Sequence, residues 1–263
     1  MDSITSKLAE YTRSATFDEL TSEAVHAAVQ RLIDSLGCGV GAYDCEPAQI
    51  GRSLASGQTP GRYAGRVLCC GDQLPVEAAT FINSAMIRNF DFNDRYPGGH
   101  PSDCLGALLA LAGATKIDGK HFLSSMTVVY EIFARLSDAT MLSRRGWDQG
   151  YAVGIATAAG VAHLLQLSAD ATARAIGIAA TSNLPLRVTR SGELTSWKNV
   201  ATAYAARNGV FAALLAAEGM RYLGALSGYD RKIWYPAAET SKIAQCLRGR
   251  RTPQCMPSSA APG

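Results

Sequence analysis

The sequence contains few of the residues and spacings that mark a metal-binding or disulfide-bonded protein. Its seven cysteines fall at positions 38, 45, 69, 70, 104, 246 and 255, and they form no C-x-x-C pair and no paired Cys/His motif. This spacing argues against zinc and iron–sulfur centres. An odd number of cysteines with mostly apolar neighbours is typical of small buried residues in a reducing compartment. We therefore expect a cytoplasmic protein that uses no metal and no other cofactor.

Charge and long apolar segments are also scarce. Charged residues make up 18% of the chain, and 25 Lys and Arg nearly balance 22 Asp and Glu. No dense stripe of Lys and Arg occurs before the last residues, which argues against nucleic-acid and membrane-surface binding. The N-terminal stretch MDSITSKLAEYTRS has no apolar core of the kind that a signal peptide needs. The most apolar run, Tyr151 to Leu167, is rich in Ala and Gly and contains His163, so we expect a buried helix and no membrane span.

What the sequence does contain is a helical pattern along most of its length. Hydrophobic residues make up 48% of the 263 residues, enough for one large domain or one domain with an appendage. One amphipathic helix is predicted from apolar residues that recur at helical spacing on one face: Val25, Ala28, Val29, Leu32, Ile33 and Leu36. Further helices are predicted at residues 76–89, 102–114, 120–137, 148–167, 169–180 and 196–218. Only GRVLCCG, residues 65–71, suggests a strand, so the sequence predicts an all-α domain built as a multi-helix bundle.

Several residues suggest where helices start and stop. Thr16 and Glu19 have the spacing of a capping box, and Ser168 is a candidate N-cap. Pro75 stands where a first helical turn accepts proline, and Gly219 is a candidate C-terminal stop.

Two short motifs match known binding sites only in part. GCGVGA, residues 37–42, fits the loose dinucleotide pattern, but it follows an amphipathic helix and not a strand. Its glycines are better interpreted as helix packing positions. DFNDRY, residues 91–96, starts like a calcium loop, but its fifth and sixth positions are Arg95 and Tyr96, and no glutamate falls at the twelfth. Neither a dinucleotide nor a calcium ion is predicted.

The loop before the helix expected at residue 102 carries more charge than a connection between buried helices needs. Its Pro-Gly-Gly segment supplies turn residues, yet Asp91, Asp94 and His100 lie in the same stretch. Charged side chains concentrated on a loop between rigid elements favour a functional site. A helix that starts at Ser102 would also offer its free N–H groups to a bound carboxylate.

Lys198 is predicted in the first turn of the last helix, where a cation gains nothing from the helix dipole. Such a lysine either faces solvent or binds an anion. His100, in its Gly-Gly-His-Pro context, either takes part in chemistry or only satisfies backbone groups. The residues by themselves leave both alternatives open.

Three segments together resemble the MmgE/PrpD family, which includes 2-methylcitrate dehydratase, cis-aconitate decarboxylase and iminodisuccinate epimerase. They are NFDFNDRYPGGHPSD, AAGVAHLLQLS and SWKNVATAYAARNGVFAALLAAEG, in the family's order within residues 5–225. The resemblance implies a helical domain that is joined in the family to an α/β lid domain, and a homodimer. It also implies an active site between the domains around Asp91, His100 and Lys198.

The chain departs from the family pattern in two places. Arg95 stands where decarboxylase members carry a small hydroxyl residue, which counts against cis-aconitate decarboxylation. The resemblance ends at about Tyr235. We therefore expect a family-like helical domain at residues 1–235, no lid domain, and a disordered, non-family tail at 236–263 that is rich in Pro, Ser and Arg.

The residues and the resemblance together suggest a metal-independent lyase of the 2-methylcitrate dehydratase type that acts on a small di- or tricarboxylate. Removal of water needs a base, an acid and fixed positive charge. We assign Asp91, with a pKa raised by burial, as the base, His100 as the acid, and Lys198 as a carboxylate ligand. Asp94 is expected to orient Arg95 or His100. The expected substrate-binding residues are Asp94, Arg95, Ser102 and Arg190.

Three alternatives stay open, and one of them is a cis-aconitate decarboxylase-like enzyme in spite of Arg95. Epimerase or isomerase chemistry begins with the same proton removal, and a non-catalytic, dimerising relic of the family would need no chemistry at all. The apolar helices at residues 151–167 and 200–217 offer more surface than one lidless domain can cover, so we expect a homodimer.

Overall fold

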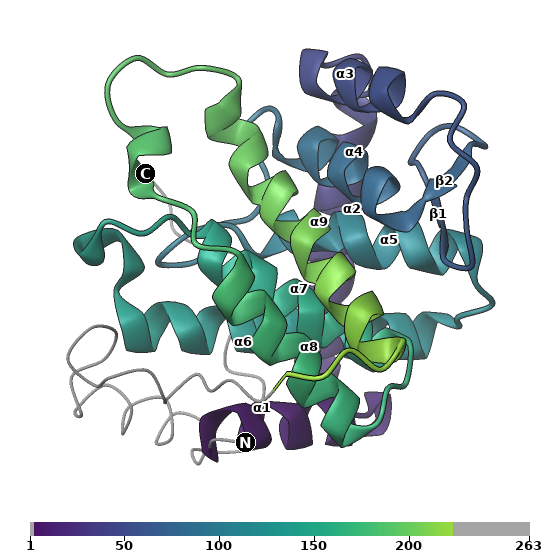
Figure 1. Cartoon of the computed structure of the whole chain (residues 1–263), viewed down its shortest axis with the longest axis vertical. Helices are drawn as coiled ribbons and strands as arrows, with labels where there is room; N and C mark the ends of the chain where they lie inside the picture. Colours follow the sequence, from purple (N-terminus) through teal and green to yellow (C-terminus); the bar gives the residue numbers. More distant parts are fainter. Residues whose placement is uncertain (1–2, 223–263) are drawn as a thin grey trace.

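The computed structural model describes residues 3–222, so the predicted boundary at residue 235 and the predicted tail lie outside the described residues. Within residues 3–222 the chain forms a bundle of nine α-helices (Figure 1). These are α1 (Ser3–Ser14), α2 (Ser22–Gly41), α3 (Glu46–Ala55), α4 (Val76–Arg88), α5 (Leu105–Ala114), α6 (Gly119–Thr140), α7 (Gly150–Leu164), α8 (Ala169–Ser182) and α9 (Trp197–Ala217). Four short 3-10 helices are η1 (Phe17–Glu19), η2 (Pro101–Cys104), η3 (Leu142–Arg145) and η4 (Arg187–Arg190). The all-α prediction is confirmed.

Helix α7 is the centre of the bundle, and every one of its residues is buried. It packs against α6, α8 and α9, which surround it in Figure 1. Small residues allow this close packing: a Cβ on Gly209 of α9 would lie 2.5 Å from the backbone oxygen of Gly154 in α7. A helix buried on every side has no single apolar face, which explains why its sequence reads as one continuous apolar run.

Helix α9 crosses the face formed by α4 and α7 and also contacts α8 (Figure 1). Among residues 3–222 it is the one helix long and apolar enough to cross a membrane. However, 67% of its most apolar window is buried inside the protein, as expected for a core helix. Its first turn carries Lys198 into the candidate site described below.

The predicted helices are all present, and the ends of the six with predicted bounds agree to within three residues, whereas α2 continues five residues beyond Leu36. The residues 102–104 form the separate 3-10 helix η2, while α1 and α3 were not predicted. Ser168 caps α8 by accepting a hydrogen bond from the amide of Ala171 at 3.2 Å, and Gly219 has the positive φ, +93°, of a helix stop.

The capping box predicted at Thr16 and Glu19 is wrong. Thr16 precedes η1 and makes no capping hydrogen bond with its side chain. Helix α2 is capped by Thr21, which accepts a hydrogen bond from the amide of Ala24 at 3.2 Å. Thr16 precedes a 3-10 helix of three residues, whereas Thr21 precedes a helix of 20 residues, whose free N–H groups need a cap.

A small antiparallel sheet lies against α4 and α5. Strands β1 (Ala64–Arg66) and β2 (Gln73–Pro75) pair with Ala64 opposite Pro75. The strand predicted at residues 65–71 is therefore correct only for its first two residues, because the rest forms the connection to β2. Pro75 precedes the first residue of α4 and serves as its N-cap.

Candidate active site

The loop between α4 and η2 is held in shape by backbone conformations that few residue types adopt. Asp91 has a φ of +62°, a left-handed conformation that aspartate tolerates better than most residues. Tyr96 and Gly99 exchange two backbone hydrogen bonds of 2.8 and 2.9 Å. A Cβ on Gly99 would lie 1.6 Å from Oε1 of Gln149, so only glycine fits there. The same Gln149 oxygen accepts a hydrogen bond from the amide of His100 at 2.7 Å, and this contact fixes the start of η2.

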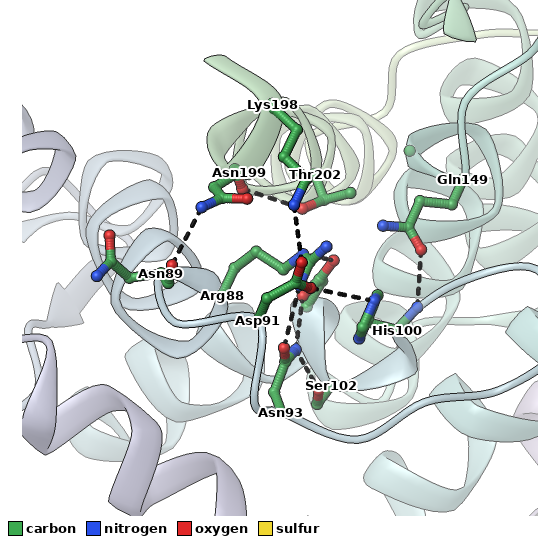
Figure 2. A network of polar contacts seen from close by, with 12 residues as sticks. Arg88, Asn89, Asp91, Asn93, His100, Ser102, Gln149, Lys198, Asn199 and Thr202 are labelled. Carbon is green, nitrogen blue, oxygen red and sulfur yellow. Dashed lines mark hydrogen bonds and ion pairs between the residues drawn. The ribbon is translucent and has the colours of Figure 1, made fainter. Parts of the chain in front are cut away.

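Asp91 lies at the centre of the three residues predicted to be catalytic (Figure 2). Its Oδ2 accepts a hydrogen bond from Nζ of Lys198 at 2.7 Å, across 107 residues of sequence. Its Oδ1 lies 3.6 Å from Nε2 of His100. The Asp91 side chain is 43% exposed, so the cluster can be reached from solvent. The fold thus brings the loop and the first turn of α9 together, and Lys198 binds an anion that belongs to the protein itself.

Arg88, the last residue of α4, completes the cluster and was not predicted. Its side chain is 2% exposed, its Nη1 donates to Asp91, and its Nη1 also lies 3.3 Å from Oδ1 of Asn93. Its Nε lies 3.5 Å from the fully buried carboxylate of Asp103. A buried arginine needs such partners, because an unpaired buried charge is costly. The available sequence signal was an arginine at the end of an apolar helix, three residues before Asp91.

The prediction that Asp91 has a raised pKa is wrong. Burial by itself would raise the pKa of Asp91, but the hydrogen bonds and positive charges of Lys198 and Arg88 outweigh it. Together they hold the pKa of this carboxyl well below its usual value. In this arrangement Asp91 is an ionised carboxylate with little tendency to take up a proton.

His100 is oriented by the loop that precedes it. Its Nδ1 lies 2.6 Å from the backbone oxygen of Asp94, which can only accept, so Nδ1 carries the proton that is donated. In the neutral ring Nε2 then has a free lone pair, and this nitrogen faces Asp91. His100 is thus oriented by the backbone of Asp94, whereas the Asp94 carboxylate, which was expected to orient Arg95 or His100, accepts hydrogen bonds from Ser102.

Ser102 does not offer its amide to a ligand as expected. The residue is fully buried, and both its N–H and its hydroxyl donate to Oδ1 of Asp94, the amide at 3.1 Å. Its oxygen also accepts a hydrogen bond from Asn93 at 2.8 Å. The negative group at this turn is thus the side chain of Asp94, and neither Asp94 nor Ser102 lines the cavity described next.

A cavity of about 500 Å³ opens beside Asp91 and His100. Its charged lining consists of Arg88, Arg95, Arg187, Arg190, Asp91 and Asp148, together with His100. Arg190, predicted to bind substrate, is held by both carboxylate oxygens of the buried Asp148. Arg95 and Arg187 have no acidic partner within residues 3–222, and Arg187 was not predicted. The two arginines are therefore the free positive charges of this cavity.

The fold and this cluster define an all-α domain with an acid–base group at the edge of an arginine-lined cavity. The chain belongs to the MmgE/PrpD family, because its residues 6–225 match the model of the MmgE/PrpD N-terminal domain. The resemblance found in the sequence is thereby confirmed.

Curated relatives give the same family assignment. The chain is 33% identical to 2-methylcitrate dehydratase of Salmonella typhi over 245 residues, which is 85% of this chain and 47% of that protein. It is 30% identical to the cis-aconitate decarboxylase-like protein oryM of Aspergillus oryzae, over 87% of this chain and 49% of that protein. It is 33% identical to 2-methylcitrate dehydratase of Escherichia coli strain K12, over 74% of this chain and 44% of that protein. The chain thus spans about half the length of these relatives.

Proposed function

We propose that the chain acts in a metal-independent lyase of the 2-methylcitrate dehydratase type on a small di- or tricarboxylate. The observation that carries this proposal is the Asp91–His100–Lys198 cluster at the edge of a cavity with two free arginines. The proposal is also supported by relatives named 2-methylcitrate dehydratase, which are 33% identical to the chain.

Arg95 and Arg187 supply the charge that a substrate with several carboxylates needs. Their guanidinium groups can each hold a carboxylate by two hydrogen bonds. Arg190 contributes less, because Asp148 already occupies it. Positive charge fixed in a cavity also stabilises the negative charge that develops when a proton is removed next to a carboxylate.

The substrate-free geometry favours His100 over Asp91 as the proton acceptor. A neutral His100 presents the lone pair of Nε2 at the cavity edge, with Nδ1–H anchored on the Asp94 backbone. Asp91, held ionised by Lys198 and Arg88, would stabilise the imidazolium that forms 3.6 Å away. Protonated His100 and Lys198 are then the proton donors of the cluster for a departing hydroxyl group.

Lys198 gives Asp91 a second possible role. A substrate carboxylate that binds Lys198 competes with Asp91 for the same ammonium group, which now lies 2.7 Å from Asp91. Loss of that partner would raise the pKa of Asp91 towards its usual value and make it a better base. The role of Asp91 as the base therefore stays a prediction that depends on Lys198 moving to the substrate.

Three alternative functions for the same site are distinguished by experiment. An epimerase would use the same proton acceptor and retain the hydroxyl group. A decarboxylase is suggested by the relative oryM, but Arg95 at the cavity wall departs from the decarboxylase pattern. A non-catalytic relic would bind carboxylates weakly and release no product.

The experiment that tests the proposal is a stopped assay for the unsaturated product of 2-methylcitrate. Residues 1–263 span about half of the named dehydratases, so we expect a turnover well under the usual ~1–1000 per second but above the rate measured without protein. Product formation that disappears in His100→Ala supports the lyase. Inversion of the substrate without product indicates an epimerase, and neither reaction indicates a relic.

We also propose that the protein self-associates through α2. The earlier reason for a homodimer was wrong in part, because α7 is buried and offers no surface. Helix α2 packs its small residues inward and leaves Val29, Ile33 and Val40 exposed, with Leu36 half-buried. These four residues are spaced 4, 3 and 4 apart, the pattern by which a helix pairs with an identical copy.

A further inference from the structure

A second cavity, of about 600 Å³, lies at the opposite end of the central helix from the candidate active site. It shares no lining residue with the first cavity. Gln149, next to the start of α7, borders the first cavity, and His163, near its end, borders the second. Fourteen residues of helix separate them by about 21 Å. The proposed lyase chemistry therefore makes no use of the second cavity.

Two imidazole rings form one wall of this cavity. His121 and His163 stack with ring centroids 4.9 Å apart and planes tilted by 24°. Nε2 of His121 lies 3.1 Å from the backbone oxygen of Leu164, and Nε2 of His163 lies 2.9 Å from that of Ala15. Because both oxygens only accept, both Nε2 atoms carry protons.

The remaining nitrogens of the two rings are placed differently. Nδ1 of His163 contacts the hydroxyl of Ser125 at 2.8 Å. Nδ1 of His121 has no hydrogen-bond partner within residues 3–222. Burial lowers the pKa of His163, and the neighbouring His121 lowers it further. The Nδ1 atom of His121 is therefore the ring nitrogen of the stack that is left for a ligand.

The other charged groups around the stack leave the cavity positive. Arg13 and Lys120 line it and have no acidic partner within residues 3–222, although Lys120 lies over the ring of Phe17. The one acidic residue of the lining is Asp118. It caps α6 by accepting a hydrogen bond from the amide of His121 at 2.8 Å. From α8 the lining receives only the uncharged Thr172.

We propose that this cavity is a second binding site, for a small anion with phosphate or carboxylate groups. Arg13 and Lys120 would hold the anionic oxygens, and Nδ1 of His121 would donate a hydrogen bond after the stack takes up one proton. The volume is within the range of about 300–1,000 Å³ that small-molecule sites occupy. The ligand would sit between α1, α6 and α7, and so tie the start of the chain to the central helices.

The test uses the chain's four histidines, whose imidazole nitrogen signals are few enough to resolve by NMR. Inorganic phosphate and citrate are titrated separately into the full chain. We expect the signals of His121 and His163 to shift and His121 Nδ1 to become protonated. A shift with both ligands indicates a general anion site, and a shift with citrate only indicates a carboxylate site. His100 reports binding at the candidate active site independently, so failure of one site does not hide the other.

Two variants with equal loss of charge decide whether the binding is specific. Arg13→Ala/Lys120→Ala should weaken the anion affinity, measured from the shift of the His121 signals, at least tenfold. Lys7→Ala/Lys116→Ala removes the same charge from residues outside the cavity and should change it less than twofold. No shift at His121 with either ligand, or equal weakening by both double variants, would overturn the proposal.

Discussion

Replacement of Arg88 by methionine should be among the most destabilising single substitutions in this protein. Arg88 is 2% exposed, and it is the charge partner of Asp103, which is fully buried. Methionine keeps most of the side-chain volume but leaves Asp103 without its cation. Breaking a buried pair in this way typically costs about 3–5 kcal/mol. For a domain of this size each kcal/mol lowers the melting temperature by about 2–4 °C, so we expect a decrease of about 6–20 °C.

The effect should depend on pH in a defined direction. Burial raises the pKa of Asp103, and Arg88 opposes that rise. Without Arg88 the pKa rises further, so Asp103 takes up a proton more readily in the folded state and part of the lost stability returns as the pH falls from 8 to 5. The assay is thermal unfolding followed by circular dichroism at both pH values.

Two further variants isolate the buried pair. Arg88→Met/Asp103→Asn removes both charges and should recover a large part of the loss, because asparagine can still accept the hydrogen bond from Asn93. Arg144→Met, at an exposed arginine, should stay within about 0.5 kcal/mol of the wild type. A melting temperature of Arg88→Met within about 2 °C of the wild type would refute the reasoning.

Three other predictions follow from the site and the surface. Lys198→Ala should raise the pKa of Asp91, because the carboxyl loses one of its two cationic partners. Ionised Asp91 stabilises the folded state above about pH 3.9, and this contribution is lost as the pH falls. The variant should reduce that contribution. A carboxyl NMR titration checks this, and an unchanged Asp91 would count against the ion pair. Any turnover should survive exhaustive chelation, because the proposed proton transfers use His100, Asp91 and Lys198 and the proposed carboxylate binding uses arginines. A rate restored by iron or magnesium would contradict this. Ile33→Glu should weaken self-association in sedimentation at micromolar concentration, whereas Gln49→Glu on α3 should not, and a monomeric wild type would exclude the α2 interface.

The helices and the grouping of Asp91, His100 and Lys198 were predictable because their signals are local or came with the family resemblance. Apolar periodicity or a long apolar run marks most of the helices, and the loop from Asp91 to His100 concentrates charge where a simple turn needs none. Ser168 and Gly219 follow rules that depend on a few neighbouring residues only. Helix α1 was missed because its buried residues, Ile4, Thr5, Leu8, Ala9 and Thr12, include polar ones.

The partners of each charged side chain could not be predicted, because they depend on residues far apart in sequence. Lys198 could be identified as an anion ligand, but its anion, Asp91, lies 107 residues away. Arg187 lines the cavity on a segment that is joined to the end of η3 by the hydrogen bond of its amide to the backbone oxygen of Gly146 at 2.8 Å. The sign of the Asp91 pKa shift was wrong for the same reason: burial could be guessed, whereas Arg88 and Lys198 on either side of it could not.

The central claim is that Asp91, His100 and Lys198 form one substrate site with the arginines of the adjoining cavity. The most direct measurement is the binding of 2-methylcitrate to the full chain, followed calorimetrically and through the imidazole signals of His100. The account predicts that 2-methylcitrate shifts the His100 signals and that Lys198→Ala and Arg187→Ala each weaken binding at least tenfold. Arg144→Ala should leave the affinity unchanged. Binding that leaves the His100 signals in place, or that is unaffected by loss of Lys198 and Arg187, would contradict it.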